Sequence, residues 1–277
     1  MCWYNLLRLT KIINMRILSC GLTLLLLLSL SACKKGDGLN LFSLQQDKDF
    51  GLKLKNEIQL NPSQYPVLPY IGNEQAYNYL YAMRDEILAS DQIRYKSNFN
   101  WELFIIDDDS TLNAFCAPGG YIYVYTGIIK FLDEADHLAG VLGHEIAHAD
   151  QRHSTQQMTE TYGIELLLAI LAGDNPGMLA QIAANLTALS FSRAHETDAD
   201  DHSVDYLCDT GYSSNGAAAF FQKLISQGQA GGTPAFLSTH PDPGNRVQSI
   251  NQKASSLGCS TSLKPNAGWT GFQSLFP

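Results

Sequence analysis

The sequence predicts an α+β fold that is mostly α-helical and contains a small β-sheet. Apolar residues recur at helical spacing in residues 73–90 and again from residue 133 to about residue 152. Residues 99–106 and 121–125 are instead rich in aromatic and β-branched residues, which is typical of strands. The chain has 277 residues, 45% of them hydrophobic, which is enough to bury a substantial core. We also expect helices over residues 192–208, 214–227 and 244–256.

Acidic residues outnumber basic residues along the chain. The formal net charge is -9 at pH 7. Residues 1–32 contain three basic residues and no acidic residue, so the remainder has 15 basic and 27 acidic residues, a net charge of -12. An acidic chain without a basic run is a poor match for the negatively charged backbone of nucleic acids. We therefore expect no nucleic-acid partner.

The N-terminal segment has the pattern of a secretory signal. Met15 and Arg16 precede a leucine-rich run that ends at Leu30 and is followed by two small residues and Cys33. The run is shorter than the roughly 20 residues that a membrane-spanning helix needs. Its ending, Leu-Ser-Ala-Cys, resembles the lipobox of bacterial lipoproteins, which implies a lipid on Cys33. An ordinary signal peptide with a chance cysteine is the alternative.

This pattern divides the first part of the chain. We expect a lipoprotein-type signal peptide over residues 1–32, with Met15 as a second candidate for the first residue. A polar, lipid-anchored tether is predicted over residues 33–57. Lys34 stands where an aspartate would favour retention in the inner membrane. We therefore expect attachment to the outer membrane of a bacterial cell envelope, facing the periplasm.

Three cysteines lie beyond the leader, which is an odd number for an oxidising compartment. A disulfide between Cys208 and Cys259 would leave Cys116 as a free thiol. Three buried thiols are the alternative. The sequence alone does not choose between the two.

The most hydrophobic part of the mature chain is residues 164–191, which a Gly-Asp-Asn-Pro-Gly break at residues 173–177 divides. Neither half is long enough to span a bilayer. Buried helices of an α-rich domain are one interpretation. A surface that contacts the membrane near the lipid anchor is the other.

An H-E-x-x-H pattern lies inside the helix predicted from residue 133. Its histidines, His144 and His148, are four positions apart and therefore face the same way, so both imidazoles can reach one metal ion. Glu145 lies one position further round, where it can contact a metal-bound water. This arrangement is typical of zinc peptidases.

A catalytic zinc site usually has three protein ligands, so a third ligand must come from elsewhere. His153 follows His144 by nine residues, which would turn it to the opposite side of the helix, and we expect a structural or surface role. Glu196 lies on a later polar helix and has Asp200 four positions on. Asp200 could accept the free ring N–H of a ligand histidine. A solvated acidic helix face is the alternative.

Four segments resemble the gluzincin metallopeptidases related to HtpX, to the CAAX prenyl endopeptidases and to the periplasmic BepA/LoiP-type enzymes. They occur in the order in which that family has them. The resemblance implies a mostly helical, zincin-like catalytic domain over residues 58–258, in which the edge strand of a small sheet flanks the active-site helix. Residues 259–277 would form a C-terminal tail. The segments are residues 113–120 (NAFCAPGG), 138–148 (LAGVLGHEIAH), 192–200 (SRAHETDAD) and 238–241 (STHP).

The resemblance also implies roles for single residues. Glu196 would be the third ligand of one Zn²⁺, in a Glu-x-x-x-Asp pattern that Asp200 completes. The family usually has glutamate where this chain has Asp198, which is not a ligand. His240 matches a histidine near the metal, where it would fill the open position or steady the oxyanion; a surface histidine is the alternative. Arg246 would hold a substrate carbonyl or cap its own segment.

These expectations describe a zinc-dependent endopeptidase in which Glu145 activates a zinc-bound water. The substrate would be an unfolded or misassembled envelope protein, lying extended beside residues 121–125 as an added strand. The alternative is a gated or inactive metallopeptidase-like lipoprotein that acts as a chaperone or assembly factor. A membrane-embedded prenyl-protein protease fits poorly, because it would need several spanning helices.

Overall fold

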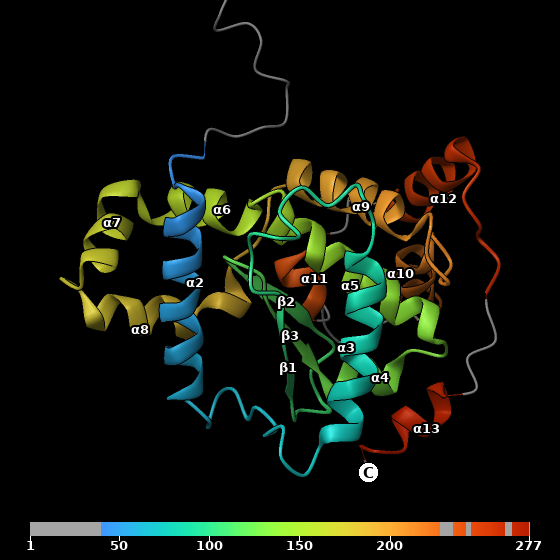
Figure 1. Ribbon diagram of the computed structural model, residues 1–277, viewed down its shortest axis with the longest axis horizontal. Coiled ribbons are helices and arrows are strands. Elements are labelled where there is room, and N and C mark those ends of the chain that lie inside the picture. Colours follow the sequence, from blue (N-terminus) through green and yellow to red (C-terminus); the bar gives the residue numbers. More distant parts are fainter. Residues whose placement is uncertain (1–39, 228–234, 242–244, 264–267, 277) are drawn as a thin grey trace, which may run out of the picture. The chain divides into compact units, whose positions relative to one another are not determined.

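The computed structural model describes residues 40–227, 235–241, 245–263 and 268–276. The predicted signal peptide, Met15 and the predicted lipid attachment at Cys33 lie outside these residues. The described part is mostly helical with one small sheet, which confirms the predicted fold class (Figure 1). Its elements in chain order are α2 (Leu44–Gln59), α3 (Glu74–Leu88), β1 (Glu102–Ile106), β2 (Ala114–Ala117), β3 (Tyr121–Tyr125), α4 (Thr126–Phe131), α5 (Ala135–Asp150), α6 (His153–Tyr162), α7 (Ile164–Ala172), α8 (Pro176–Ala184), η2 (Leu186–Ala188), α9 (Arg193–Leu207), α10 (Gly216–Ser226), α11 (Ala235–Thr239), α12 (Arg246–Leu257) and α13 (Trp269–Gln273).

The sheet has the strand order β1–β3–β2, with β1 parallel and β2 antiparallel to β3. The edge strand β2 packs against α5, as expected for the sheet edge beside the H-E-x-x-H helix. The expectation that substrate lies beside residues 121–125 is wrong. Those residues form β3, which is paired on both sides and buried along its whole length. The strongest strand pattern thus marks the centre of the sheet. The short edge strand β2 is not predicted by the sequence pattern.

Side chains alternate along β3 between two hydrophobic cores. Ile122 and Val124 face the larger core, together with residues of α3, α5, α9 and α10. Tyr121, Tyr123 and Tyr125 face the smaller core, together with residues of α2, α7 and α8. Figure 1 shows α2, α7 and α8 on one side of the sheet and α3, α5 and α10 on the other. The sheet therefore separates α5, which carries the H-E-x-x-H motif, from α2, α7 and α8.

Two segments with polar composition are parts of the folded unit. The prediction of a tether is wrong for residues 44–57, because they belong to α2, whose Phe50, Leu54 and Ile58 are fully buried. These apolar residues recur every four positions within a helix whose other residues are mostly polar. In the predicted C-terminal tail, Trp269 and Phe272 of α13 are also buried against the larger core.

The apolar residues 164–191 contain α7, α8 and η2, and α7 and α8 meet at an angle of 116° across the break between them. Within the described residues no single helix is long and apolar enough to cross a membrane. Only α7 and α8 taken together reach the length and apolar composition of a membrane span. Each helix buries one face: Leu167 and Ile170 of α7 are buried, whereas Leu168 is 40% exposed. The interpretation as buried helices is therefore only half correct, and membrane contact stays a prediction.

Close packing brings α10 and α9 onto α5. A Cβ atom on Gly140 of α5 would lie 2.0 Å from the backbone nitrogen of Ala217, so α10 can approach only because this residue is glycine. Ser203 of α9 donates a hydrogen bond of 3.1 Å to the Gly140 carbonyl. Backbone and side chain thus hold α9 and α10 against the helix that carries the histidines.

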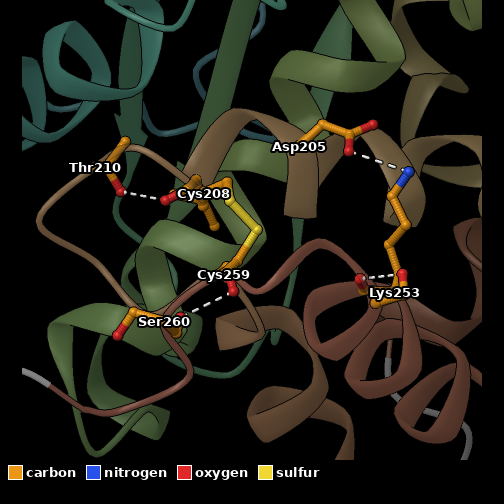
Figure 2. The surroundings of a disulfide bond; sticks show 9 residues. Asp205, Cys208, Thr210, Lys253, Cys259 and Ser260 are labelled. Carbon is orange, nitrogen blue, oxygen red and sulfur yellow. Dashed lines mark hydrogen bonds and ion pairs between the residues drawn. A yellow bond between two sulfur atoms is a disulfide. The ribbon is translucent and has the colours of Figure 1, made fainter.

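A disulfide joins the end of α9 to the residue after the α12 C-cap (Figure 2). Cys208 and Cys259 have Cα atoms 5.0 Å apart, and Cys116 is a free, buried thiol. Of the two alternatives for the cysteines, the disulfide is confirmed. An ion pair of 3.0 Å between Lys253 and Asp205 joins the same two helices. Burial raises the pKa of the Cys116 thiol, which keeps it protonated.

Removing the disulfide should destabilise the fold. The bond spans a sequence separation of 51 residues, and the loss of loop entropy in the unfolded chain predicts a cost of about 4 kcal/mol for the Cys208→Ser/Cys259→Ser variant. Urea unfolding of the variant and of the parent protein measures this difference. Reductant should lower the stability of the parent to that of the variant and leave the variant unchanged. Equal stability of both proteins without reductant would contradict the prediction.

Candidate metal centre

The two histidines of the H-E-x-x-H motif converge on one point. Both project from α5, and their Nε2 atoms lie 2.9 Å apart. Both side chains are buried, with exposed fractions of 1% or less. The Phe191 ring stacks on His148 with a centroid separation of 4.0 Å. The helix thus orients both imidazoles as the spacing of His144 and His148 predicts.

Glu196 reaches the same point from α9. Ser192 caps this helix through its hydroxyl, which accepts from the His195 backbone, and so places Glu196 in the first turn. The Glu196 carboxylate oxygens lie 3.5 Å from His144 Nε2 and 3.3 Å from His148 Nε2. The side chain is fully buried. The alternative of a solvated acidic face is therefore wrong at this position.

His240 is the fourth member of the cluster. It follows α11 and is fully buried, so the alternative of a surface histidine is wrong. Its Nδ1 atom lies 3.3 Å from His144 Nε2 and 3.0 Å from Glu196 Oε1. The Phe236 ring stacks on it with a centroid separation of 4.3 Å. Its other ring nitrogen, Nε2, is 3.5 Å from the Glu145 carboxylate.

The donor atoms of these four residues suit zinc. They lie within 4.8 Å of one another, and imidazole nitrogen and carboxylate oxygen are ligands that zinc accepts. Tetrahedral zinc with bonds near 2.0–2.1 Å has ligand atoms about 3.3 Å apart, close to the separations described above. Both carboxylate oxygens of buried Glu145 accept no hydrogen bond from the described residues. A buried acceptor of this kind needs a partner, and a water at the metal would supply one.

A second set of charged residues lies behind the cluster. Asp200 accepts from His144 Nδ1 at 2.9 Å, as the sequence predicts for the carboxylate behind a ligand. Arg246 is buried and donates to both Asp200 oxygens, at 2.7 and 2.5 Å. Its Nη1 atom is 2.8 Å from Glu196 Oε2. Arg246 therefore links the two buried acidic residues of α9, Glu196 and Asp200, and its guanidinium is directed at their carboxylates.

His153 lies beside His148, so its expected position on the opposite side of the helix is wrong. Its Nδ1 atom is 3.1 Å from His148 Nδ1, and its side chain is buried. Helical geometry does not extend to this residue, because α5 ends at Asp150 and Arg152 has the left-handed φ of 62°. The chain therefore turns back and begins α6 at His153. No pattern in the sequence indicates this turn.

Without a metal, burial and neighbouring charges give the members of the cluster different protonation states. Burial alone would lower the pKa of His144, but hydrogen bonds to Asp200 and Glu196 raise it to about 9. Burial and the neighbouring His144 lower the pKa of His148 well below its usual value. Burial would raise the pKa of Glu196, but His240 and hydrogen bonds from both histidines hold it well below its usual range. Glu196 is therefore a carboxylate and His148 a neutral imidazole at pH 7, the forms that bind a cation, whereas His144 is protonated and must release a proton when a metal binds.

Known metallopeptidases are similar to more than half of this chain. The mitochondrial metalloendopeptidase OMA1 of Schizosaccharomyces pombe is 34% identical over 160 residues, which cover 56% of this chain and 47% of that protein. The metalloprotease YcaL of Escherichia coli is 28% identical, with 57% and 63% covered. The beta-barrel assembly-enhancing protease of Yersinia pestis is 27% identical, with 57% and 35% covered. The match thus spans less than two thirds of each relative.

A family model confirms the resemblance that the sequence motifs indicate. Residues 74–254 match the model of peptidase family M48, and this range is more than half of the chain. It includes the cluster of His144, His148, Glu196 and His240, together with Arg246 behind it. The chain therefore belongs to peptidase family M48, whose members are zinc-dependent metallopeptidases.

Proposed function

We propose that this protein is a zinc-dependent endopeptidase that hydrolyses peptide bonds of unfolded or misassembled proteins in the bacterial cell envelope. One observation carries the proposal. Three metal-binding side chains, His144, His148 and Glu196, converge beside Glu145, a buried carboxylate whose oxygens accept no hydrogen bond from the described residues. This combination supplies both a metal site and a base next to it.

The reaction needs a metal and a base. When bound, zinc lowers the pKa of a water molecule and polarises the scissile carbonyl. His144, His148 and Glu196 hold the metal. Glu145 accepts the proton of the attacking water on a carboxylate oxygen and passes it to the leaving amine. Burial raises the pKa of Glu145, which makes its carboxylate a stronger base than an exposed glutamate.

Asp200 and Arg246 support this centre from behind. Asp200 accepts the Nδ1 proton of His144, which leaves Nε2 free to bind a metal. Arg246 partly neutralises the two buried carboxylates of α9. Because its guanidinium is bound to Asp200 and Glu196, we assign it to positioning these residues rather than to a substrate carbonyl.

An extended substrate would pair with β2, since β3 is central. In the antiparallel register the main-chain groups of Ala114 and Cys116 face away from β3. The Cys116 carbonyl accepts from the Ser154 hydroxyl at 3.1 Å, and the Ala114 amide donates to the Asn113 side chain at 2.9 Å. A substrate backbone would replace these two side-chain partners. Such pairing uses main-chain hydrogen bonds and depends little on the side chains of the substrate, which suits varied unfolded substrates.

The cell envelope is the proposed location. The lipobox-like ending at Cys33 supports a lipid anchor, and Lys34 after it supports attachment to the outer membrane. Relatives named beta-barrel assembly-enhancing protease support a role in quality control of envelope proteins. Other relatives are mitochondrial enzymes, so the chemistry is not tied to one compartment.

The second candidate is a gated or inactive metallopeptidase-like lipoprotein that acts as a chaperone or assembly factor. The position of His240 favours it, because His240 Nδ1 lies as close to Glu196 as the two α5 histidines do. Four protein ligands describe a closed zinc site. His240 would then have to move before a substrate could enter.

Glu145→Gln should abolish proteolysis and preserve the metal. The amide cannot accept the water proton, so cleavage of casein should fall by about 10²–10⁴-fold or more, while zinc content stays at one per chain. Glu160→Gln, which changes an exposed glutamate on α6, is the matched control and should cleave casein normally. Undiminished cleavage by Glu145→Gln would refute the mechanism.

The His240→Ala variant separates the two candidates. If His240 closes an active site, its removal opens the fourth position, and casein cleavage should rise above that of the parent protein. If neither protein cleaves casein, while both prevent its aggregation, the chaperone-like function is supported. Lower cleavage by the variant would instead assign His240 to stabilising the oxyanion.

Zinc should stabilise the metal-stripped protein through Glu196. Ligand binding to the folded state alone predicts a gain of about 2.7 kcal/mol at a zinc concentration 100 times the dissociation constant. The measurement is the rise in Tm when zinc is added after removal of metal by a chelator. Glu196→Gln should lose most of this rise, and the neighbouring Asp201→Asn should keep it. An equal rise in all three proteins would place the metal elsewhere.

A further inference from the structure

The two ring nitrogens of His148 have different partners. Nε2 faces the metal-binding cluster, 2.9 Å from His144 Nε2 and 3.3 Å from Glu196 Oε1. Nδ1 faces away from it, 3.1 Å from His153 Nδ1. The second nitrogen of His153, Nε2, lies 3.2 Å from Asp198 Oδ2. These contacts form a chain that leads from His148 through His153 to Asp198.

The position of the His148 proton determines where the other protons lie in this series of contacts. Given the proposed metal site, His148 binds through the lone pair of Nε2, so its proton is on Nδ1. That proton can be donated only if His153 Nδ1 is unprotonated. His153 then carries its own proton on Nε2, which donates to Asp198. One carboxylate thus selects the tautomers of two histidines.

The two α5 histidines are therefore supported in different ways. Asp200 accepts directly from His144 Nδ1, at 2.9 Å. His148 has no carboxylate at its own Nδ1 among the described residues, and the charge of Asp198 reaches it through His153. A carboxylate behind a histidine ligand fixes its orientation and raises its basicity.

The fold holds His153 in place with contacts of its own. Arg152, whose left-handed φ turns the chain back, donates to the Asp47 carboxylate of α2. Thr155 donates to the other oxygen of Asp47 at 2.8 Å. The His195 ring stacks on His153 with a centroid separation of 4.4 Å and an interplanar angle of 18°. The residues beside His153 are thus bound to α2, and its ring lies against His148 of α5 and His195 of α9.

We propose that His153 and Asp198 are positioning residues that hold His148 in the tautomer and orientation that bind the metal through Nε2. His153 acts as the acceptor for His148, and Asp198 keeps that acceptor available. The inference rests on the proposed metal centre and adds two residues to it.

Zinc affinity of the metal-stripped full chain tests this proposal, measured by competition with a chromophoric chelator. Loss of support behind a histidine ligand weakens metal binding by about 10–100-fold. We expect this loss in His153→Phe, which keeps a ring but removes the acceptor. Asp198→Asn should show it too, because its amide can donate to His153 Nε2 and force the wrong tautomer. Asp198→Glu keeps the carboxylate and should restore affinity to within about threefold of the parent value.

His202→Gln is the matched control. His202 also faces Asp198, at 3.8 Å, but has no contact with His148 among the described residues. It should bind zinc like the parent protein. His153 and Asp198 act in series. The double variant His153→Phe/Asp198→Asn should therefore lose no more zinc affinity than whichever single variant binds zinc less tightly. Asp198 is 48% exposed, so Asp198→Asn should fold, and the Tm of the metal-free variants checks this.

The outcomes separate this inference from the proposed function. If the parent protein binds no zinc, the proposed metal centre is wrong and the inference is wrong with it. If the parent binds zinc and His153→Phe and Asp198→Asn bind it equally well, only the inference is overturned. Losses that add in the double variant, or that Asp198→Glu does not reverse, would show a general structural effect and would also overturn it.

Discussion

Full burial of Glu196 is the constraint on which the rest of the centre depends. A carboxylate without water must be paired with cations or hydrogen-bond donors, because its desolvation is costly. His144, His148, His240 and Arg246 all lie within 3.5 Å of this one side chain. They come from α5, the end of α11 and the start of α12. Satisfying one buried charge therefore brings three separate elements to α9.

Backbone packing allows this convergence. The absence of a side chain at Gly140 lets α10 lie directly on α5, and the Ser203 hydroxyl ties α9 to the same residue. The disulfide from Cys208 to Cys259 then joins the far ends of α9 and α12. Because α12 begins with Arg246, the bond helps to keep this guanidinium near Asp200 and Glu196. The disulfide and the residues that support the proposed metal site thus lie on the same two helices, α9 and α12.

Much of the centre could be predicted because it depends on local helical geometry. The four-residue spacings of His144 to His148 and of Glu196 to Asp200 hold in α5 and α9, and each pair faces the cluster. Family resemblance added His240 and Arg246, which no local pattern connects to α5. The expectations that failed depended on tertiary structure. The left-handed Arg152 reverses the chain before His153, and the apolar face of α2 is hidden in a polar composition.

The central claim is that His144, His148 and Glu196 hold one zinc ion beside Glu145. A crystal structure of the zinc-loaded protein, with anomalous data collected at the zinc absorption edge, tests this most directly. The account predicts one anomalous peak per chain, bonded to Nε2 of both α5 histidines and to a Glu196 oxygen, with water or His240 as the fourth ligand. A peak elsewhere, or bonds to zinc that omit Glu196, would contradict it.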